Sequence, residues 1–150
     1  MTFAMGLVER EAFLAEARFG VLSVAQEDGV ATLAVPIWYA FTPGREVVIH
    51  THRRSRKAHL IRTTGRFGIC VQADTSPVRY VSVEGPVTCE SDVEPAAREA
   101  MAHRYLPPHM ARAYLEATAE QQVGVSVAFH MRPTRWRTAN YGAMSLDPSS

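Results

Sequence analysis

The sequence predicts a mainly β protein, an antiparallel barrel of about six strands with helices at its periphery. Six short runs rich in β-branched residues follow one another at close spacing, separated by turn residues or short helical segments. Helical patterns occur only at the start of the chain, in one segment that crosses between strands, and in one pair of helices. In a parallel sheet, by contrast, strands and helices would alternate along the chain. With 150 residues, 47% apolar and 21% charged, the chain suits a single domain, 1–150, with one core.

The first half of the chain begins with a helix, followed by a hairpin and a third strand. Apolar residues spaced by threes and fours predict an amphipathic helix over Leu7 to Arg18. Two β-type runs, Gly20 to Ala25 and Ala31 to Phe41, flank the turn Glu27-Asp28-Gly29 and indicate a hairpin. The β-branched run Glu46 to Thr51 predicts the next strand.

A short basic segment, His52 to Arg62, interrupts the strands, and we predict a helix that crosses between them. Ser55 is a candidate N-cap for this helix, and Ala58 and Ile61 fall on one helical face. The chain's only lysine, Lys57, lies in its first turn. The segment therefore places basic side chains at the start of a helix.

The second half of the chain contains a strand pair, a helical pair and a last strand. Alternate residues of the second strand point to opposite faces, and Gly85-Pro86 indicates a bulge in it. Pro107-Pro108 separates the two helices, and the tail 144–150 is expected to fray. The predicted strands are Arg66–Ala73, Arg79–Cys89 and Val123–His130, and the predicted helices are Glu94–Tyr105 and His109–Ala119.

The net charge and the N-terminal sequence indicate which binding partners and which cellular compartment to expect. A formal charge of +1 at pH 7 creates no overall field for nucleic acid or an anionic membrane, so we expect neither as a partner. The N-terminal residues have neither the charged start nor the apolar run of a signal peptide, which predicts a cytoplasmic protein. Cys70 and Cys89 lie singly within predicted strands, which favours reduced, buried thiols over a metal site or a disulfide.

The end of the strand 46–51 and the start of the basic helix together form a candidate anion site. A phosphate monoester needs free backbone N–H groups, a favourable helix dipole and cations, and Ser55-Arg56-Lys57 supplies all three after His50-Thr51. Arg56 offers a fork of donors and Lys57 a compact charge, while Thr51 or Ser55 adds a hydroxyl. The alternative interpretation is a basic helical face that is simply solvated.

The order His50-Thr51 and then Ser55 to His59 resembles the phosphate-binding stretch of the pyridoxamine 5′-phosphate oxidase-like, FMN-binding split-barrel superfamily. The likeness continues in Leu33 to Trp38, the strand on which that family lays the flavin ring, and in Arg79 to Gly85. It continues through the late Trp136 and covers most of the chain, from about Gly20 to Gly142. The resemblance implies an antiparallel split barrel of the FMN-binding type.

Within the superfamily, the chain differs from the vitamin-forming oxidases. Trp38 stands where their cofactor strand carries a lysine, and their C-terminal Arg-Leu-His motif is missing. The compact length and the ending 135–141 are more similar to the F420-dependent branch, the deazaflavin-dependent reductases. That branch contains members that use coenzyme F420, members that use FMN, and others that bind planar tetrapyrroles.

The resemblance implies a cofactor site with its ring along 35–38 and its phosphate at the start of the basic helix. The cofactor-binding residues that we predict are Val35, Pro36, Ile37, Trp38, His50, Thr51, Ser55, Arg56, Lys57, Tyr80 and Trp136. Trp136 is expected to approach from a partner chain, because the cofactor groove and the dimer interface coincide in this superfamily. A homodimer is also expected because Trp38, Tyr39, Tyr80 and Trp136 have the pattern of exposed aromatics, whose apolar surface a two-fold interface can bury. For Trp38 and Tyr39, an edge-strand or interface position is the alternative to a cofactor contact.

The function that follows is an oxidoreductase in which reduced F420, or FMN, passes a hydride to an electron-poor planar small molecule. No catalytic residue and no metal ligand set is identified, because neither the six histidines nor the carboxylates have the required spacing. This suits a cofactor that brings its own reactive atom, with solvent, or a tyrosine such as Tyr39 or Tyr141, as the candidate source of a proton. The alternatives are a non-catalytic flavin or tetrapyrrole (haem or biliverdin) binding protein and a purely structural dimeric barrel.

Overall fold

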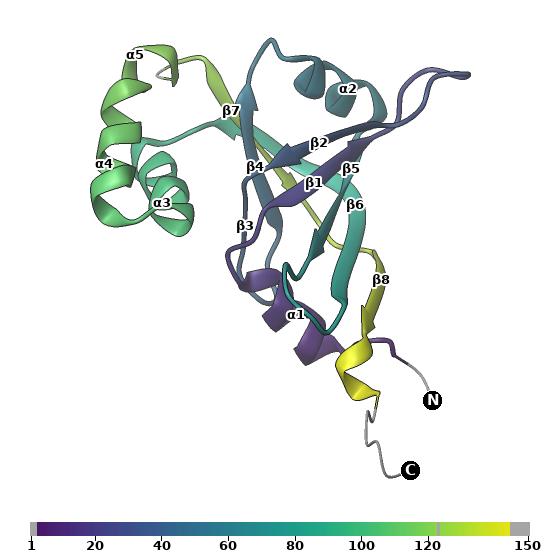
Figure 1. Ribbon diagram of the computed structural model, residues 1–150. Helices are drawn as coiled ribbons and strands as arrows, with labels where there is room; N and C mark the ends of the chain where they lie inside the picture. The colour runs from purple at the N-terminus through teal and green to yellow at the C-terminus, as the bar shows by residue number, and fades with distance from the viewer. Residues whose placement is uncertain (1–2, 123, 145–150) are drawn as a thin grey trace.

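The computed structural model describes residues 3–122 and 124–144, and in these ranges eight strands form one curled antiparallel sheet with helices around it (Figure 1). The strands are β1 (Gly20–Val24), β2 (Leu33–Ile37), β3 (Tyr39–Phe41), β4 (Val47–His52), β5 (Arg66–Gln72), β6 (Arg79–Asp92), β7 (Ser126–Met131) and β8 (Arg135–Asn140). The helices are α1 (Leu7–Ala15), α2 (Arg56–Thr64), α3 (Pro95–Tyr105), α4 (Pro108–Ala117) and α5 (Ala119–Gln122), with a 3-10 turn η1 (Tyr141–Ala143). The predicted split barrel with peripheral helices is confirmed.

The sheet has the strand order β2-β1-β5-β6-β7-β4-β3, and β8 pairs with β6 beside this path. The 14-residue strand β6 belongs to both halves of the barrel, because its first part pairs with β5 and β8 and its last part with β7. The two end strands, β2 and β3, are separated in sequence by Trp38 alone. The sheet therefore curls until its ends meet at this residue.

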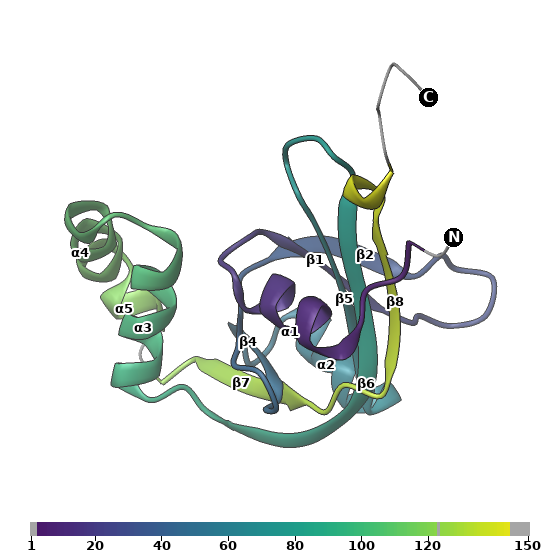
Figure 2. The same cartoon turned by 90° about the horizontal axis from the view of Figure 1, so that it is seen from below.

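The core fills the inside of the curl. Strand residues alternate between the core and the outside, as in β5, where Ile69 is buried and the next residue, Cys70, is exposed. Helix α1 lies at one opening of the barrel and α2 at the other, whereas α3, α4 and α5 stand to one side (Figures 1 and 2). Buried core side chains include Phe13 and Leu14 of α1, Ala58, Leu60 and Ile61 of α2, and Leu22, Ile49, Val81 and Phe129 of the sheet.

The connection between β7 and β8 runs closely over β6 at Gly85. The backbone N–H of Arg132 donates to the Pro86 carbonyl at 3.0 Å, and that of Thr134 to the Glu84 carbonyl at 2.9 Å. A Cβ at Gly85 would overlap the carbonyl oxygen of Arg132, so glycine is required for this approach. The bulge predicted at Gly85-Pro86 was misplaced, because the register shift lies between Val87 and Cys89.

Several predicted elements have different limits. The run 31–41 is two strands because the chain bends at Trp38, and β8 was missed because its sequence, RWRTAN, lacks an apolar alternation. As a result the sheet has eight strands instead of about six. Helix α1 ends at Ala15, before the predicted Arg18, because Glu16 is extended with φ −73° and ψ 145°. The short helix α5 was also not predicted.

Both cysteines are free and exposed, so the expected burial of their thiols was wrong. Cys70 faces outward because it lies opposite Val21 and Ser82, on the face of the sheet that points away from the core. In the described residues, no helix combines the length and apolar character needed to cross a membrane. The tail 144–150, predicted to fray, lies outside the described residues except for Met144.

We predict that Gly85→Ala lowers the free energy of unfolding by about 1–3 kcal/mol, because the new methyl group must displace the backbone at Arg132. Gly6→Ala is a matched control, since a Cβ there meets nothing within 4 Å, and it should cost less than about 1 kcal/mol. Urea denaturation of both variants measures the difference. Equal stability of the two variants would show that the β7–β8 connection tolerates a side chain at this position.

Candidate functional site

Helix α2 begins as the sequence predicts, with Ser55 as its N-cap. Ser55 has extended backbone angles, φ −68° and ψ 157°, and its Oγ accepts a hydrogen bond from the N–H of Ala58 at 3.1 Å. The Thr51 hydroxyl at the end of β4 lies 2.9 Å from the same Ser55 oxygen. This contact joins strand and helix, and it fixes the loop between them.

The first turn of α2 retains hydrogen-bond donors that the described residues leave unused. The first helical bond runs from the N–H of His59 to the Ser55 carbonyl, so the N–H groups of Arg56 and Lys57 have no intrahelical acceptor. The Lys57 ammonium makes no hydrogen bond or ion pair with any described residue, whereas the Arg56 guanidinium donates to Gln26 Oε1 at 3.1 Å. Backbone donors and one unpaired cation therefore coincide at the positive end of the helix.

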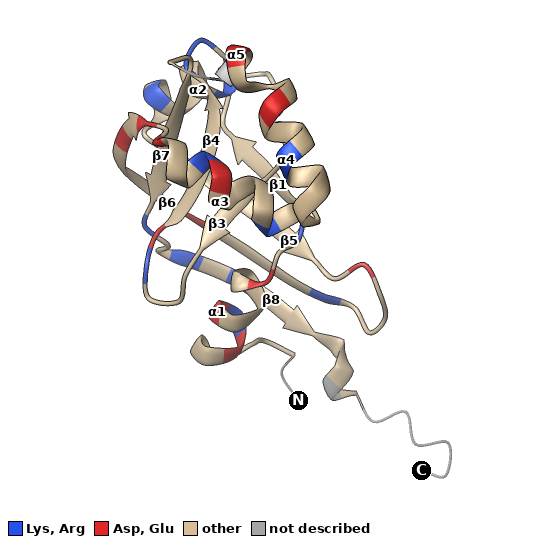
Figure 3. Cartoon of the chain, turned by 90° about the vertical axis from the view of Figure 1, so that its left-hand side faces the viewer, with Lys and Arg blue, Asp and Glu red and all other residues tan. Residues whose placement is uncertain are grey.

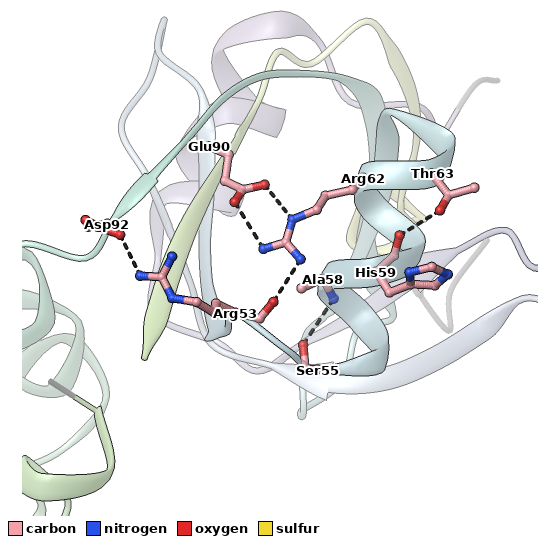
Figure 4. A network of polar contacts seen from close by, with 8 residues as sticks. All are labelled: Arg53, Ser55, Ala58, His59, Arg62, Thr63, Glu90 and Asp92. Atoms are coloured by element: carbon pink, nitrogen blue, oxygen red, sulfur yellow. Dashed lines mark hydrogen bonds and ion pairs between the residues drawn. The ribbon is translucent and has the colours of Figure 1, made fainter. Parts of the chain in front are cut away.

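Two basic residues near α2, Arg53 and Arg62, are paired with acidic residues of β6 (Figure 4). Arg62 donates to both carboxylate oxygens of Glu90, at 2.8 and 3.0 Å, and also to the Arg53 carbonyl at 2.8 Å. Arg53 in turn pairs with Asp92 at 2.7 Å. The hydrogen bonds from Arg62 hold the pKa of Glu90 below its usual value. These residues form a structural network between α2 and β6, whereas Lys57, Arg54 and Arg56 form no ion pair with a described residue.

A cavity of about 260 Å³ brings together part of the predicted site. From the predicted set, it is lined by Ile37, Trp38, His50, Thr51 and Lys57. The remaining wall comes from residues that sequence reasoning missed, namely His52, Val93, Arg98, Met101, Ala102, Tyr114 and Ser126. The available signal was the spacing of Arg98, Met101 and Ala102, which places these three residues on one face of α3.

Trp38 connects the barrel to the helices α3 and α4. Its indole ring stacks on Tyr105 of α3, with ring centroids 5.0 Å apart and planes at 6°, and it meets Tyr114 of α4 at 5.3 Å. The Tyr105 hydroxyl accepts a hydrogen bond from the N–H of Tyr39 at 3.1 Å and lies 3.0 Å from the Arg18 carbonyl oxygen, which it can donate to. Trp38 therefore lines the cavity while the helices cover most of its ring.

Tyr39 is a core residue, and its predicted exposure was wrong. It is fully buried, and its hydroxyl donates to the carbonyl of Leu14 at 2.7 Å. Burial is the main cause that raises its pKa above the ordinary value. Because the chain bends at Trp38, Tyr39 turns into the barrel, where it has no access to the cavity and cannot serve as a proton donor there. Tyr141, the other candidate donor, is exposed on η1 and contacts Phe3.

The remaining predicted residues lie apart from the cavity in this single chain. Val35 packs against the core, and Pro36 is exposed on the outer face of the sheet. Tyr80 is half-buried on β6 opposite Ala139. Trp136 lies beside α1, where the Arg10 guanidinium sits 4.4 Å from its ring centroid. Ser55 and Arg56 border the first turn of α2 without lining the cavity.

His50 lies between the cavity and a second, larger hollow of about 510 Å³ beneath α3. Burial and, to a lesser degree, the neighbouring His130 lower the pKa of His50 from 6.5 to about 4. The imidazole is therefore neutral at neutral pH, when it can donate one hydrogen bond and accept another. No group of three or more metal-binding side chains gathers within the described ranges.

We predict that stability falls as the pH is lowered from about 6.5 towards 4, since His50 binds a proton more readily in the unfolded chain over this interval. His50→Gln should flatten this dependence, whereas His109→Gln, at an exposed position on α4, should leave it unchanged. Urea unfolding at pH 7.5, 6 and 5 provides the measurement. Parallel curves for the wild type and His50→Gln would contradict the burial of a neutral imidazole.

Solved structures with the same fold come from proteins of several kinds. An F420 reductase superposes with a TM-score of 0.66 at 22% identity, over 85% of this chain and 94% of that chain. A conserved hypothetical protein from Mycobacterium tuberculosis gives 0.69 at 24% identity, over 98% of this chain and 95% of its own. A heme binding protein from Mycobacterium smegmatis gives 0.61 at 17% identity, over 93% of this chain and 56% of that one. These identities establish a shared fold alone.

The family comparison covers nearly all of the structure. No curated protein matches the sequence. The family model described as pyridoxamine 5′-phosphate oxidase matches residues 8–140, which extend from α1 to the end of β8 and include the candidate anion site at α2. The split-barrel fold agrees with this match. The chain belongs to the pyridoxamine 5′-phosphate oxidase family.

Proposed function

We propose that this protein is an oxidoreductase that binds F420, or alternatively FMN, and passes a hydride to an electron-poor planar small molecule. The proposal rests mainly on Lys57, which lines a cavity at the positive end of α2 and makes no hydrogen bond or ion pair with a described residue. The family match and the structural likeness to an F420 reductase support a cofactor-dependent role.

The residues at α2 fit a cofactor phosphate. The N–H groups of Arg56 and Lys57, together with the ammonium, supply donors and charge, and Thr51 and Ser55 share one hydrogen bond, so one hydroxyl proton remains free to donate. When bound, the flavin or deazaflavin ring supplies the hydride chemistry. The chain binds the phosphate, orients the ring near Ile37 and Trp38, and excludes water with α3 and α4.

F420 is preferred over FMN on two grounds. Trp38 replaces the lysine that the vitamin-forming oxidases carry on this strand, so the chain lacks a cation that they hold near the ring. One of the solved structures with this fold is an F420 reductase. Tyr39 is excluded as a proton donor by its burial, and we propose that the proton of the reduced product comes from solvent.

We predict that Lys57→Ala weakens binding of FMN or F420 by roughly tenfold to a hundredfold, because it removes a charge-assisted contact of about 1.5–3 kcal/mol. Riboflavin, which lacks the phosphate, should bind the variant and the wild type equally. Arg54→Ala is the matched control, since Arg54 is exposed and stands before the N-cap. Isothermal titration calorimetry of each pair gives the dissociation constants. If the variant loses the same affinity for FMN as for riboflavin, or loses none for either, Lys57 does not contact the phosphate.

We also propose a homodimer in which the outer face of β1, β2 and β5 is covered by a second copy. Val21, Pro36 and Cys70 are neighbours on this face and are all exposed, and Phe19 beside them is 69% exposed. Burial of such a patch favours association. The approach of Trp136 to the partner chain's cofactor stays a separate prediction, because in the single chain Trp136 packs against the core beside α1.

We predict that light scattering gives twice the chain mass of 16.6 kDa. Val21→Arg should shift the protein towards the monomer, because a charge on this face must be desolvated on association. Met110→Arg, at an exposed position on α4, serves as the control and should leave the mass unchanged. A monomeric wild type at micromolar concentration would contradict the shared cofactor groove.

A non-catalytic flavin or tetrapyrrole carrier is the second candidate function. It is favoured by the structural likeness to a heme binding protein, which this chain matches over 93% of its own length. Absorption spectra separate the candidates, because FMN absorbs in the blue and near ultraviolet and haem gives a Soret band. A Soret band that survives gel filtration, without flavin binding, would favour the carrier over the oxidoreductase.

A further inference from the structure

The hollow of about 510 Å³ beneath α3 is separate from the candidate anion site at α2. It lies between the outer face of β3, β4 and β7 and the helix α3, which stands beside these strands (Figure 1). It shares the side chains of His50, Val93 and Met101 with the cavity that Lys57 lines, but Lys57 itself does not line it. Its volume falls in the range of about 300–1,000 Å³ that small-molecule sites occupy.

The hollow exists because α3 presents small side chains to the sheet in its first half. Ala97, Ala100, Met101 and Arg104 are spaced by threes and fours on one helical face, and all four line the hollow. Met101 is buried, whereas Ala97 and Ala100 remain exposed. Helix α3 therefore docks on the barrel with its second half and leaves a space beneath its first half, unlike the close packing of a protein interior.

Two histidines, His50 of β4 and His130 of β7, lie on the sheet side of the hollow. His50 pairs with Ala128 and His130 with Val48, so the two imidazoles are diagonal neighbours on one face of the sheet. No described residue forms a hydrogen bond with either imidazole. Half-buried polar groups of this kind usually have a partner, and a neutral imidazole can donate one hydrogen bond and accept another. The hollow therefore offers unused hydrogen-bonding groups inside a mostly apolar wall.

The charged residues that line the hollow give an anion no binding partner. Arg104 donates to two backbone carbonyls at the C-terminal end of α1, at 2.9 and 3.1 Å. Asp92 pairs with Arg53 at 2.7 Å. Glu94 forms no ion pair with a described residue, so its negative charge is uncompensated. This arrangement is the reverse of the neighbouring cavity, where the uncompensated charge of Lys57 is positive.

We propose that the hollow beneath α3 binds a neutral, mostly apolar small molecule that carries a hydroxyl or carbonyl group. The apolar part of the ligand lies against the alanines of α3 and of the sheet, and its oxygen atom forms a hydrogen bond with His130 or His50. Burial of apolar surface provides most of the affinity, and the imidazoles orient the ligand. The site goes beyond the proposed function, because it does not depend on which cofactor binds at α2.

The first test uses 2-naphthol, a neutral ring compound with one hydroxyl group, and follows the backbone amides of the wild type by NMR at pH 7.5. We expect saturable binding with a dissociation constant on the order of 0.1–1 mM, and shifts concentrated in β3, β4, β7 and α3. The anion 2-naphthoate has the same rings, and it should bind about tenfold more weakly, because its carboxylate loses water without gaining a free cation. Absence of saturable binding, or equal affinity for 2-naphthoate, would overturn the proposal.

Variants locate the binding to the hollow. Ala100→Leu places a larger side chain in the space and should weaken 2-naphthol binding by about tenfold or more. Ala96→Leu is the matched control, since Ala96 is exposed on the same helix and lines neither the hollow nor the cavity with Lys57. Leucine favours a helix almost as strongly as alanine does, so both variants should fold. Equal affinities of these two variants for 2-naphthol would place the binding elsewhere and refute the proposal.

A further variant tests the hydrogen bond. His130→Phe keeps a ring of similar shape but removes both nitrogens, so the affinity for 2-naphthol should fall about threefold to tenfold. Circular dichroism and thermal melting of the same samples verify that the variant is folded. If a folded His130→Phe variant binds 2-naphthol more tightly than the wild type does, the hollow recognises apolar surface alone and the proposed preference for a hydroxyl or carbonyl group is wrong.

Discussion

The fold and the candidate site both depend on Trp38. It is the single residue between β2 and β3, the two end strands of the sheet, so the curl of the barrel is closed covalently at this position. Its ring also stacks on Tyr105 and meets Tyr114, which holds α3 and α4 beside the barrel. Hydrogen bonds from Tyr105 and Arg104 of α3 reinforce this attachment, and the cavity lies between the barrel and the helices.

The charged residues of this chain differ in whether they form ion pairs. Lys and Arg are interspersed with Asp and Glu over much of the chain, as the view from the helical side shows (Figure 3). Exposed ion pairs of this kind contribute about 0–1 kcal/mol each, so Arg53 and Arg62 mainly orient α2 against β6. Lys57 lacks such a partner in the described residues, as do several arginines, among them Arg54 and Arg56. Lys57 differs from these arginines in lining the cavity, next to unused backbone N–H groups at the start of α2.

Local signals in the sequence predicted much of the fold. Ser55 was recognised as an N-cap, and the alternation of Val81 and Val83 predicted the inward face of β6, because both signals depend on residues adjacent in the chain. Tyr39 and the far wall of the cavity depend on tertiary contacts. Tyr39 turns inward only because the chain bends one residue earlier, and Arg98 lines the same cavity as Lys57 only when α3 docks on Trp38. No pattern of residues that are close together in the sequence predicts these tertiary contacts.

Strand β6 belongs to both halves of the barrel, and this affects how the molecule unfolds. Because its first part pairs with β5 and β8 and its last part with β7, neither half of the barrel can separate without breaking this strand. Global unfolding is therefore expected to be cooperative across both halves, with the amides of β6 among the slowest to exchange. The helices α3 to α5 stand to the side of the barrel and can open as a smaller unit. With such a hierarchy, the helical wall of the cavity is expected to open before the barrel wall that carries Lys57.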